Sequence, residues 1–518
     1  MTSVAAVGMS TILASFGAGA IAPTANAASP VSGGTMTILE NTNGIGNWPA
    51  GLDPGTNNCC LVENEPFNDA IFGQLFTQSP KGHAEPDLAT GFKFSDGNRV
   101  VSIFLRHNVK FTDGTPFDAA AVKFNIDRDL KLRASTLISS FPVKKTTTEG
   151  KYTVVLHLLY PFSPIINSFD SIIGPNWIIS PTALQKEGEK KMSLYPVGAG
   201  PFMVKTDVQN SKLVLVKNPN YWQKGHPYLD GVTFETVGTD QSAYSAVLSG
   251  EAQVVQQVAT SSTAIAAQKN PAVRVVTSHN PATGSLQLNT KIPPFNNIKA
   301  REAVYYALNQ ALLNKVAAAG QGAVSQTGDG PTSLFPILKV PGYRTYNPAK
   351  ARALVKQLGG LSFTITGFAT NPVLSEAEQS EFAAAGMKTK IDPVNLAQLV
   401  AAFRSGKWQI TGGGAGGLDP AIGVGGMTWR VQSNAPFTGI HDKTLDKLIA
   451  TGAATTDPEK RLGIYKQIFK YMSDQALMPF TYAAAQWNVS NPKAMGPGLS
   501  IPMYNNYLIQ WPDIWMAH

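Results

Sequence analysis

Charged residues are scarce in this 518-residue chain: they make up 15% of it, against about 25% in an average soluble domain. Hydrophobic residues make up 43%, which is enough for large buried cores. Lys and Arg outnumber Asp and Glu by 42 to 34, a net charge of +8, but no basic run is long enough for a nucleic-acid-binding stripe. These figures exclude a disordered chain and predict no nucleic-acid partner. The length predicts two or three domains.

Cysteine is nearly absent, and the two that occur, Cys59 and Cys60, are adjacent. A lone pair of neighbouring thiols has no metal-ligand spacing. In an oxidising compartment the two would form a strained vicinal disulfide or pair between chains. As free thiols they would be small buried hydrophobes. The sequence leaves these alternatives open.

Catalytic and metal-binding motifs are missing as well. The seven histidines include no pair at i, i+4 or at another usual ligand spacing, and no G-x-S-x-G, H-E-x-x-H or Walker lysine motif occurs. Asp127 and Asp129 lie on one predicted helix but about 200° apart around its axis, so they form no carboxylate dyad. We therefore expect no metal, no cofactor and no catalysis. An exported hydrolase with a triad spread through the chain is the alternative.

The first 28 residues carry no charge at all. They include the small, apolar run VAAVGMSTILASFGAGAIA, and Ala25 to Ala27 fit an A-x-A cleavage site, so residues 1–27 are predicted to be a secretory signal peptide despite the missing basic n-region. A membrane anchor is the alternative, although the run is glycine-rich and short of the ~20 strongly apolar residues that a span needs. No cysteine follows for lipid attachment. We expect a soluble periplasmic or extracytoplasmic protein.

The chain carries a mixed α/β pattern that changes along its length. In the first half, period-two alternation predicts strands, and Asp118 is placed to cap a helix. The second half alternates helices and strands, and Val304, Leu308, Leu312 and Val316 mark one face of a long predicted helix. The main predicted strands are 35–41, 151–159, 212–218, 361–368 and 407–411, and residues 99–111 are predicted to form a strand, a turn and the start of a second strand. The main predicted helices are 118–130, 296–320, 347–359, 395–406 and 457–475.

Several segments, in order from about Thr35 to the C-terminus, resemble the peptide/nickel class of ABC-transporter substrate-binding proteins, known as solute-binding protein family 5. That class has an L-D-P turn, a P-x-L-A segment, a strand ending in L-R-x-x-V-x-F and then D-G-T-P. It also has G-T-G-P-Y, N-x-x-Y-W, S-G-E-x-D and P-P-F segments, and here Gln253 replaces the acid of S-G-E-x-D. The matching segments of this chain are GLDP, EPDLA, FLRHNVKF, DGTP, VGAGPF, NPNYW, LSGEAQ and LNTKIPPF.

The resemblance implies an α/β, bilobal, periplasmic-binding-protein-like clamshell with two mixed α/β lobes. Its ligand would lie between the lobes and pass to an ABC permease in the cytoplasmic membrane, with the receptor a monomer. A chemosensory binder on the same scaffold is the alternative. Two crossings, near Ser278 and Tyr482, would form the hinge. The implied ranges are 28–61 with 195–278 and 483–518 for lobe I, 62–194 for a subdomain inserted in it, and 279–482 for lobe II.

A glycine-rich stretch at 410–427 contains a G-x-G-x-x-G match. A dinucleotide site would need a helix directly after the glycines, but Pro420 and further glycines follow. Peptide-binding members of the family often carry G-W-x-x-D-x-x-D-P here, with the first acid on the ligand's ammonium. Gly413 then stands in place of the tryptophan and Gly416 in place of that acid. With a one-residue gap, Asp419 would be the ammonium anchor instead.

Other candidate ligand residues are chosen by position. Asn43 follows the first strand, and Cys59 and Cys60 follow the L-D-P turn. Arg430 ends the glycine-rich stretch and could hold a carboxylate in a bidentate pair, whereas the aromatic candidates could equally be core residues. The ligand itself stays open among peptides, sugars, opine-like compounds, organic acids and metal chelates. The aromatic candidates are Trp429, Tyr482 and Trp487.

Overall fold

A computed structural model describes most of the chain beyond the predicted signal peptide. Asn43, Cys59 and Cys60 lie outside the described residues, as does the 1–27 leader. The described ranges are 29–41, 51–56, 65–79, 82–132, 141–169, 176–258, 260–369, 372–422, 426–435, 438–499 and 509–517.

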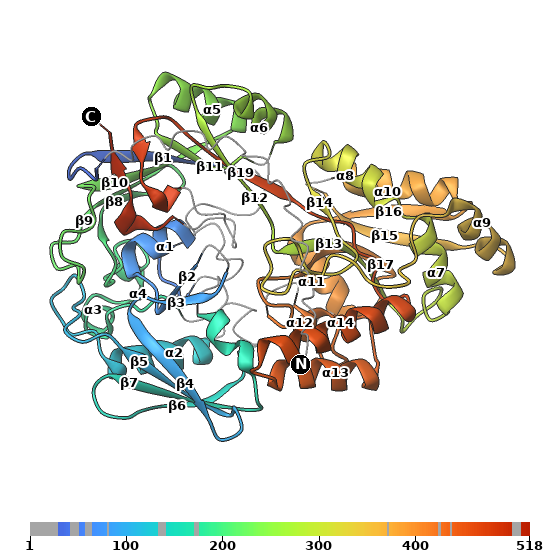
Figure 1. The fold of residues 1–518 in the computed structure, drawn as a ribbon, viewed down its shortest axis with the longest axis horizontal. Coiled ribbons are helices and arrows are strands. Elements are labelled where there is room, and N and C mark those ends of the chain that lie inside the picture. The colour runs from blue at the N-terminus through green and yellow to red at the C-terminus, as the bar shows by residue number, and fades with distance from the viewer. Residues whose placement is uncertain are drawn as a thin grey trace, which may run out of the picture.

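The largest sheet has seven strands in the order β12-β19-β11-β1-β10-β9-β8 and occupies the left half of Figure 1. Its strand β1 (Thr35–Asn41) coincides with the predicted strand and pairs in parallel with β10 and β11. Alternate residues of β1 face opposite sides: Met36 and Ile38 pack in one apolar cluster with α1, and Leu39 packs in another with α5 and α6. The remaining elements are α1 (Glu65–Phe72), β8 (Phe202–Val208), β9 (Lys212–Lys217), β10 (Gly231–Val237), α5 (Asp240–Ser249), β11 (Val254–Val258), α6 (Ser261–Gln268), β12 (Arg274–His279) and β19 (Ala485–Ser490).

A second, antiparallel sheet has the order β4-β5-β7-β6 and is packed against α2 (Ala119–Leu132). Asp118 begins this helix as predicted, because its carboxylate accepts hydrogen bonds from the amides of Ala120 and Ala121, both at 3.1 Å. The other elements of this part are β2 (Phe76–Gln78), β3 (Ala84–Pro86), β4 (Ala89–Ser95), β5 (Val100–Leu105), β6 (Val143–Thr148), β7 (Thr153–Leu158), the 3₁₀ helix η3 (Ser163–Ser168), α3 (Pro181–Glu187) and α4 (Glu189–Met192).

The third sheet, in the right half of Figure 1, has the order β13-β17-β15-β16. Helices α7 to α10 supply the apolar residues that cover one face, and α13 and α14 pack against each other in a different apolar cluster. The elements are β13 (Ala282–Leu288), α7 (Ile298–Ala307), α8 (Gln310–Ala318), β14 (Ala323–Val324), α9 (Pro348–Gln357), β15 (Ser362–Phe368), α10 (Pro372–Ala384), β16 (Lys388–Val394), α11 (Leu396–Ser405), β17 (Ile410–Gly416), α12 (Met427–Arg430), α13 (Lys443–Ala454), α14 (Pro458–Asp474) and β18 (Tyr482–Ala483).

Two chain segments connect the sheets of the two lobes. One runs from β12 to β13 and the other from β18 to β19, and they lie side by side because the amide of Asn280 donates to the carbonyl of Ala484 at 2.8 Å. Figure 1 shows both passing through the middle of the molecule. This is the bilobal α/β architecture expected from the sequence. The residue boundaries assigned to the lobes and to the inserted subdomain stay predictions.

The C-terminal tail returns to the first lobe. Its short elements are β20 (Ala494–Met495), which pairs with β21 (Trp515–Met516), and the 3₁₀ helices η4 (Pro497–Leu499) and η5 (Trp511–Asp513). Trp511 packs its ring edge-to-face with Phe202 and Phe234 of the seven-stranded sheet. The tail is therefore part of the core of lobe I.

The long helix predicted over 296–320 is wrong, because the chain forms two helices there. Leu308 ends α7 in an extended conformation, with ψ of 115°, and the side chain of Asn309 accepts from the amide of Leu312 at 3.1 Å, which caps α8. A side chain that can cap a new helix competes with continuation of the old one. Consequently Val304 is buried, whereas Leu312 and Val316 are exposed.

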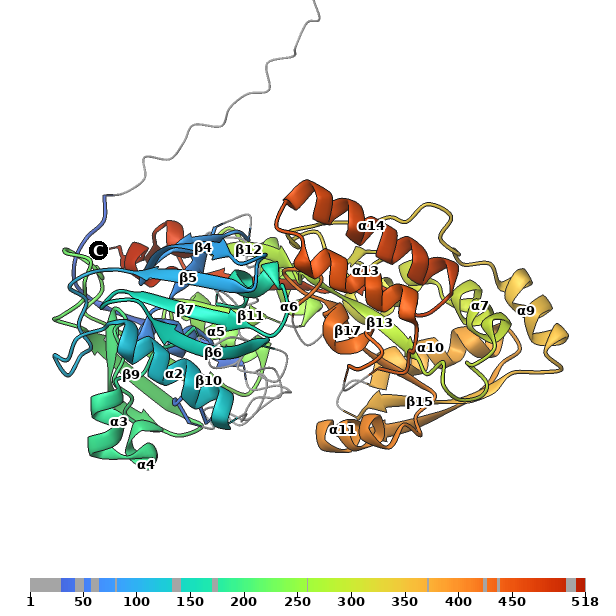
Figure 2. The ribbon, with the colours of Figure 1, turned by 90° about the horizontal axis from the view of Figure 1, so that it is seen from below.

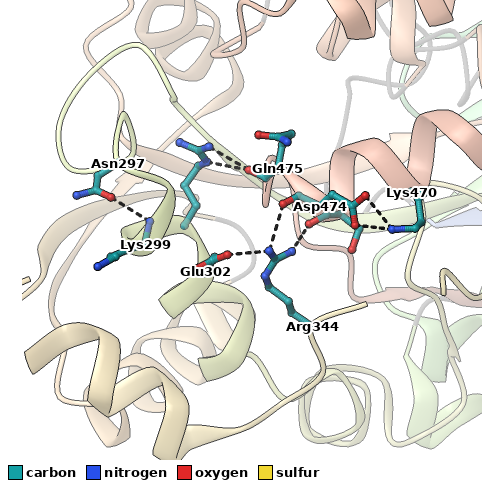
Figure 3. Close-up of polar contacts among 9 residues, drawn as sticks. Asn297, Lys299, Glu302, Arg344, Lys470, Asp474 and Gln475 are labelled. Atoms are coloured by element: carbon teal, nitrogen blue, oxygen red, sulfur yellow. Dashed lines mark hydrogen bonds and ion pairs between the residues drawn. The ribbon is translucent and has the colours of Figure 1, made fainter. Parts of the chain in front are cut away.

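Helix α14 and its C-terminal residues are anchored to lobe II by a group of polar contacts, shown in Figure 3. Arg344 donates to Glu302 at 2.7 Å and to the carbonyl of Asp474 at 3.1 Å, and Lys470 pairs with Asp474 at 2.7 Å. The carbonyl of Gln475 accepts from Arg301 of α7 at 3.0 and 3.2 Å. Figure 3 also shows Asn297 capping α7 through the amide of Lys299, a 3.0 Å bond.

Candidate functional site

The first part of the glycine-rich stretch continues the predicted strand, which was expected to end at residue 411, as far as Gly416. Strand β17 extends from Ile410 to Gly416 and pairs with β13 in antiparallel register, from Leu288 opposite Ile410 to Ala282 opposite Gly416. The backbone N–H and C=O groups of these glycines thus take part in a sheet. The described residues that follow β17, 417–422, form no helix. Together with the sheet pairing, this excludes a phosphate-cradling loop followed directly by a helix.

Arg430 lies against Gly413. A Cβ atom placed on Gly413 would be 3.2 Å from Nη1 and 3.4 Å from Nη2 of Arg430, so the guanidinium occupies the space beside the position where the family often has tryptophan. Gln287 of β13 holds α12 in place, since its Nε2 donates to the carbonyl of Arg430 at 3.0 Å. On the same face, the hydroxyl of Ser285 donates to the carbonyl of Gly413 at 3.1 Å. A side chain at position 413 would therefore crowd the guanidinium of Arg430.

Arg430 carries its charge inside the protein. Its side chain is buried, and desolvation lowers its pKa from 12.5 to about 10. Burial disfavours the charged form of a base, but a pKa of about 10 keeps the guanidinium protonated at neutral pH. A cation in such a water-poor place interacts more strongly with an anion than a surface cation does.

Asp419, the alternative ammonium anchor, faces protein groups. Its Oδ1 accepts from the hydroxyl of Tyr465 at 2.8 Å and from the amide of Ala421 at 3.0 Å, and its Oδ2 lies 3.3 Å from Nη2 of Arg461. The side chain is fully buried. This arrangement gives Asp419 a packing role in lobe II, and a role as a ligand anchor stays a prediction.

The structure brings only part of the predicted set together. Gly413, Gly416 and Arg430 lie on or beside β17, and Trp429 belongs to the same short helix as Arg430. Tyr482 is in β18 opposite Val324, partly exposed, at the crossing between the lobes. Burial raises the pKa of its hydroxyl, and the nearby carboxylate of Glu378 raises it further.

Trp487 lies apart from the others. It is 1% exposed and packs in the apolar cluster that joins the seven-stranded sheet to α5 and α6. Its partners in the sheet are Thr277 of β12 and Val258 of β11. This is the core placement that the sequence left open for each aromatic candidate, and a ligand contact by Trp487 stays a prediction.

A contact between the inserted subdomain and lobe II was not anticipated from the sequence. The hydroxyl of Ser163 in η3 donates to the carbonyl of Thr455 at 2.6 Å and accepts from Nη1 of Arg461 at 2.8 Å. Asn98 donates to the carbonyl of Ala454 at 3.2 Å. Arg461 therefore joins Asp419 of one lobe to Ser163 of the other. No sequence pattern indicates it, because the partners are 298 residues apart.

Among the described residues, no helix is long and apolar enough to cross a membrane. In the same part of the chain, no three side chains of His, Cys, Asp or Glu are grouped so that they could hold a metal ion.

Comparison with known proteins gives the family. Residues 83–428 match "Bacterial extracellular solute-binding proteins, family 5 Middle". The glutathione-binding protein GsiB of Salmonella typhimurium is 33% identical over 407 residues, which cover 73% of this chain and 77% of GsiB. This match confirms the family that the ordered motifs predicted.

Solved structures show the same fold at lower sequence identity. DppA from Helicobacter pylori, in complex with the peptide STSA, has a TM-score of 0.76 and 21% identity, covering 94% of this chain and 99% of DppA. NikA from Brucella suis, in complex with Fe(III)-EDTA, has a TM-score of 0.78 and 20% identity, covering 93% and 100%.

The matched relatives are binding proteins of transporters and not enzymes. With the bilobal fold, two crossing segments and motifs in family order, this chain belongs to the family 5 bacterial extracellular solute-binding proteins, the ligand receptors of ABC importers.

Proposed function

We propose that this receptor binds a small, peptide-like ligand between its lobes through a carboxylate, with Arg430 as the anion-binding residue. The supporting observation is the buried guanidinium, protonated at neutral pH, that lies against Gly413 of β17. A guanidinium matches a carboxylate with two parallel hydrogen bonds. The ligands in the relatives' names, glutathione, the peptide STSA and an EDTA chelate, all carry carboxylate groups.

The same geometry argues against an ammonium anchor on β17. In the alignment without a gap, Gly416 stands in place of the family's ammonium-binding acid and has no side chain. Asp419 is fully buried, with Oδ1 hydrogen-bonded to Tyr465 and Oδ2 3.3 Å from Nη2 of Arg461 but without a hydrogen bond among the described residues. A buried ammonium without a partner is costly. We therefore propose that a free amine contributes little to affinity, that the chain binds its ligand without turnover, and that it acts as an exported monomer whose mature form begins at Ala28.

Calorimetry with a library of di- and tripeptides tests the carboxylate proposal. Each peptide is used as the free acid, as the C-terminal amide and as the N-acetyl form. We expect amidation to weaken binding by about one to two decades, because a hydrogen-bonded charge pair contributes roughly 1.5–3 kcal/mol. N-acetylation should change affinity little.

Two variants accompany this series. Arg430→Gln should abolish the difference between acid and amide, whereas Arg404→Gln, which removes an exposed arginine of the same lobe, should preserve it. If amides bind as tightly as acids while N-acetylation abolishes binding, an acid such as Asp419 holds the amine and the proposal is wrong. Binding by none of the peptides would overturn the peptide-like class.

A further inference from the structure

The net positive charge of the chain is concentrated in one part of it. Residues 279–482 contain 20 of the 42 Lys and Arg residues but only 12 of the 34 Asp and Glu residues, so they carry the whole net charge of +8. The rest of the chain is balanced, with 22 charged residues of each sign. A field of one sign over one part of a protein favours a partner of the opposite sign.

Lobe II presents bases at one end of its four-stranded sheet. Strands β15, β16 and β17 run parallel, so all three begin at the same end, and the antiparallel β13 finishes there. The amide of Lys388 donates to the carbonyl of Leu361 at 2.9 Å. Gln409 accepts from the amide of Thr364 at 2.8 Å and donates to the carbonyl of Pro293 at 3.0 Å. The four segments at this end of the sheet therefore form one continuous surface.

These segments carry bases and no acids. Residues 288–300, 354–364, 386–391 and 403–411 include seven Lys or Arg residues and no Asp or Glu. All seven bases are exposed, and none of them forms an ion pair within the part of the chain that the structure describes. Their charge is therefore directed to the solvent without neutralisation. These residues, which we call the basic surface, are Lys291, Lys299, Lys356, Lys388, Lys390, Arg404 and Lys407.

We propose that the basic surface binds the anionic headgroups of a lipid membrane and so holds the receptor near the membrane in which its permease lies. Six of the seven bases are lysines, and a compact ammonium on a flexible stem suits phosphates whose positions are not fixed. A single defined anion is instead matched by a held guanidinium such as that of Arg430. Each base close to an anionic membrane strengthens partitioning by about fivefold, so even part of the basic surface gives measurable attachment.

The basic surface is separate from the candidate ligand site. Strand β17 runs from Ile410 at the basic end of the sheet to Gly416 at the other end, a distance of about 20 Å. Figure 1 shows β15 and β16 on the side of lobe II away from lobe I. Membrane contact at this end therefore leaves the space between the lobes free, and the receptor can bind its ligand while it is attached.

Co-sedimentation of the full chain with lipid vesicles tests the proposal. The vesicles are made of phosphatidylcholine alone or of an equal mixture with phosphatidylglycerol. We expect binding to the mixed vesicles at about 0.05 M salt and its loss at about 0.5 M, where surface charges are screened. Phosphatidylcholine alone should not bind. Absence of binding to the mixed vesicles would overturn the proposal, and binding to soluble poly-glutamate but not to vesicles would assign the basic surface to an acidic protein instead.

A triple variant that combines Lys356→Gln, Lys388→Gln and Lys390→Gln tests the residues. It should lower the partition coefficient for the mixed vesicles by about a hundredfold, because each lysine contributes about fivefold. Replacing the same three lysines with arginine keeps the charge and should keep the binding. Loss of binding in the arginine variant as well would show that charge at this surface is not the cause.

The matched control combines Lys144→Gln, Lys205→Gln and Lys269→Gln, three exposed lysines outside residues 279–482. It removes the same net charge, but it should lower the partition coefficient by less than about threefold, because charges far from the membrane are screened. Equal losses in both glutamine variants would show that net charge alone drives binding and would overturn the assignment. Peptide binding between the lobes should persist in every variant, so the membrane site and the proposed function can fail separately.

Discussion

Glu378 of α10 shows how burial sets the behaviour of a single residue. It is 2% exposed, and desolvation raises its pKa to about 8, with the neighbouring Glu381 raising it further. Glu381 has a pKa of about 7, again from desolvation, although its carboxylate accepts from the amide of Asn309 at 2.9 Å. Both acids are therefore more easily ionised in the unfolded chain than in the folded protein.

Replacing Glu378 with Gln should stabilise the protein at high pH. Because the folded pKa of about 8 lies above the ordinary glutamate pKa of 4.5, the stability contributed by the neutral acid is complete below about pH 4.5 and is lost as the pH rises through 8. Glutamine cannot ionise, so the free energy of unfolding at pH 9 should rise by about 1–3 kcal/mol, with little change at pH 5. Urea unfolding at both pH values measures this.

Glu376→Gln is the control, since Glu376 is exposed on the same helix and its replacement should change stability little at either pH. An identical pH dependence in Glu378→Gln and the unmutated protein would show that Glu378 does not ionise in this range.

At the scale of elements, α2 is fastened to lobe I by the L-D-P turn. Asp53 of that turn accepts two hydrogen bonds from Arg128 of α2, at 2.8 and 2.6 Å, and its side chain is buried. Gly55 makes room for the arginine, since a Cβ there would lie 2.2 Å from Nη1. The ion pair of Asp53 with Arg128, which we call the clasp, therefore joins the first lobe to its inserted subdomain. The L-D-P turn of the family motif supplies its aspartate.

Arg128→Met should destabilise the fold strongly. Removing one partner of a buried ion pair leaves an uncompensated charge and costs about 3–5 kcal/mol. Lys123→Met is the control: Lys123 pairs with Asp127 on the exposed side of the same helix, where such a pair contributes under about 1 kcal/mol. Chemical denaturation measures both. The double variant Asp53→Asn with Arg128→Met should recover part of the loss, and equal effects of Arg128→Met and Lys123→Met would contradict the clasp.

For the whole molecule, the contacts of Ser163 with Arg461 and Thr455 bring the inserted subdomain against lobe II. A ligand held between lobes shifts the population toward such a closed arrangement. Small-angle scattering should therefore show a smaller radius of gyration at saturating concentration of the tightest-binding peptide.

Ser163→Ala should increase the radius of gyration of the unliganded protein. It should also weaken the affinity for the peptide by up to about tenfold, because part of the binding energy is then used to close the lobes. Ser245→Ala, which alters an exposed serine of α5 that donates only to its own helix, should do neither. A radius that does not change with ligand would count against lobe closure.

Residues close together in the sequence were enough to predict several strands and helix ends. Strand β1 matches the predicted 35–41, and Asp118 begins α2 as expected. The side chains of Asn347, Asn395 and Asp457 likewise cap α9, α11 and α14. Each depends on residues within a few positions of one another. The family was predictable for a related reason, because short motifs in the family's order can be recognised in the sequence without any knowledge of contacts.

Only the tertiary structure decided the rest. The glycines of β17 have low strand propensity, and pairing with β13, more than a hundred residues earlier, makes them a strand. Leu308 suits a continuous helix by periodicity, but the cap at Asn309 ends it. Three further features join separate segments of the chain: the contact of Arg430 with Gly413, the clasp of Asp53 with Arg128, and the basic surface at one end of the third sheet. Sequence spacing carries no information on such contacts, because burial and pairing between lobes and sheets arise only when the whole chain packs.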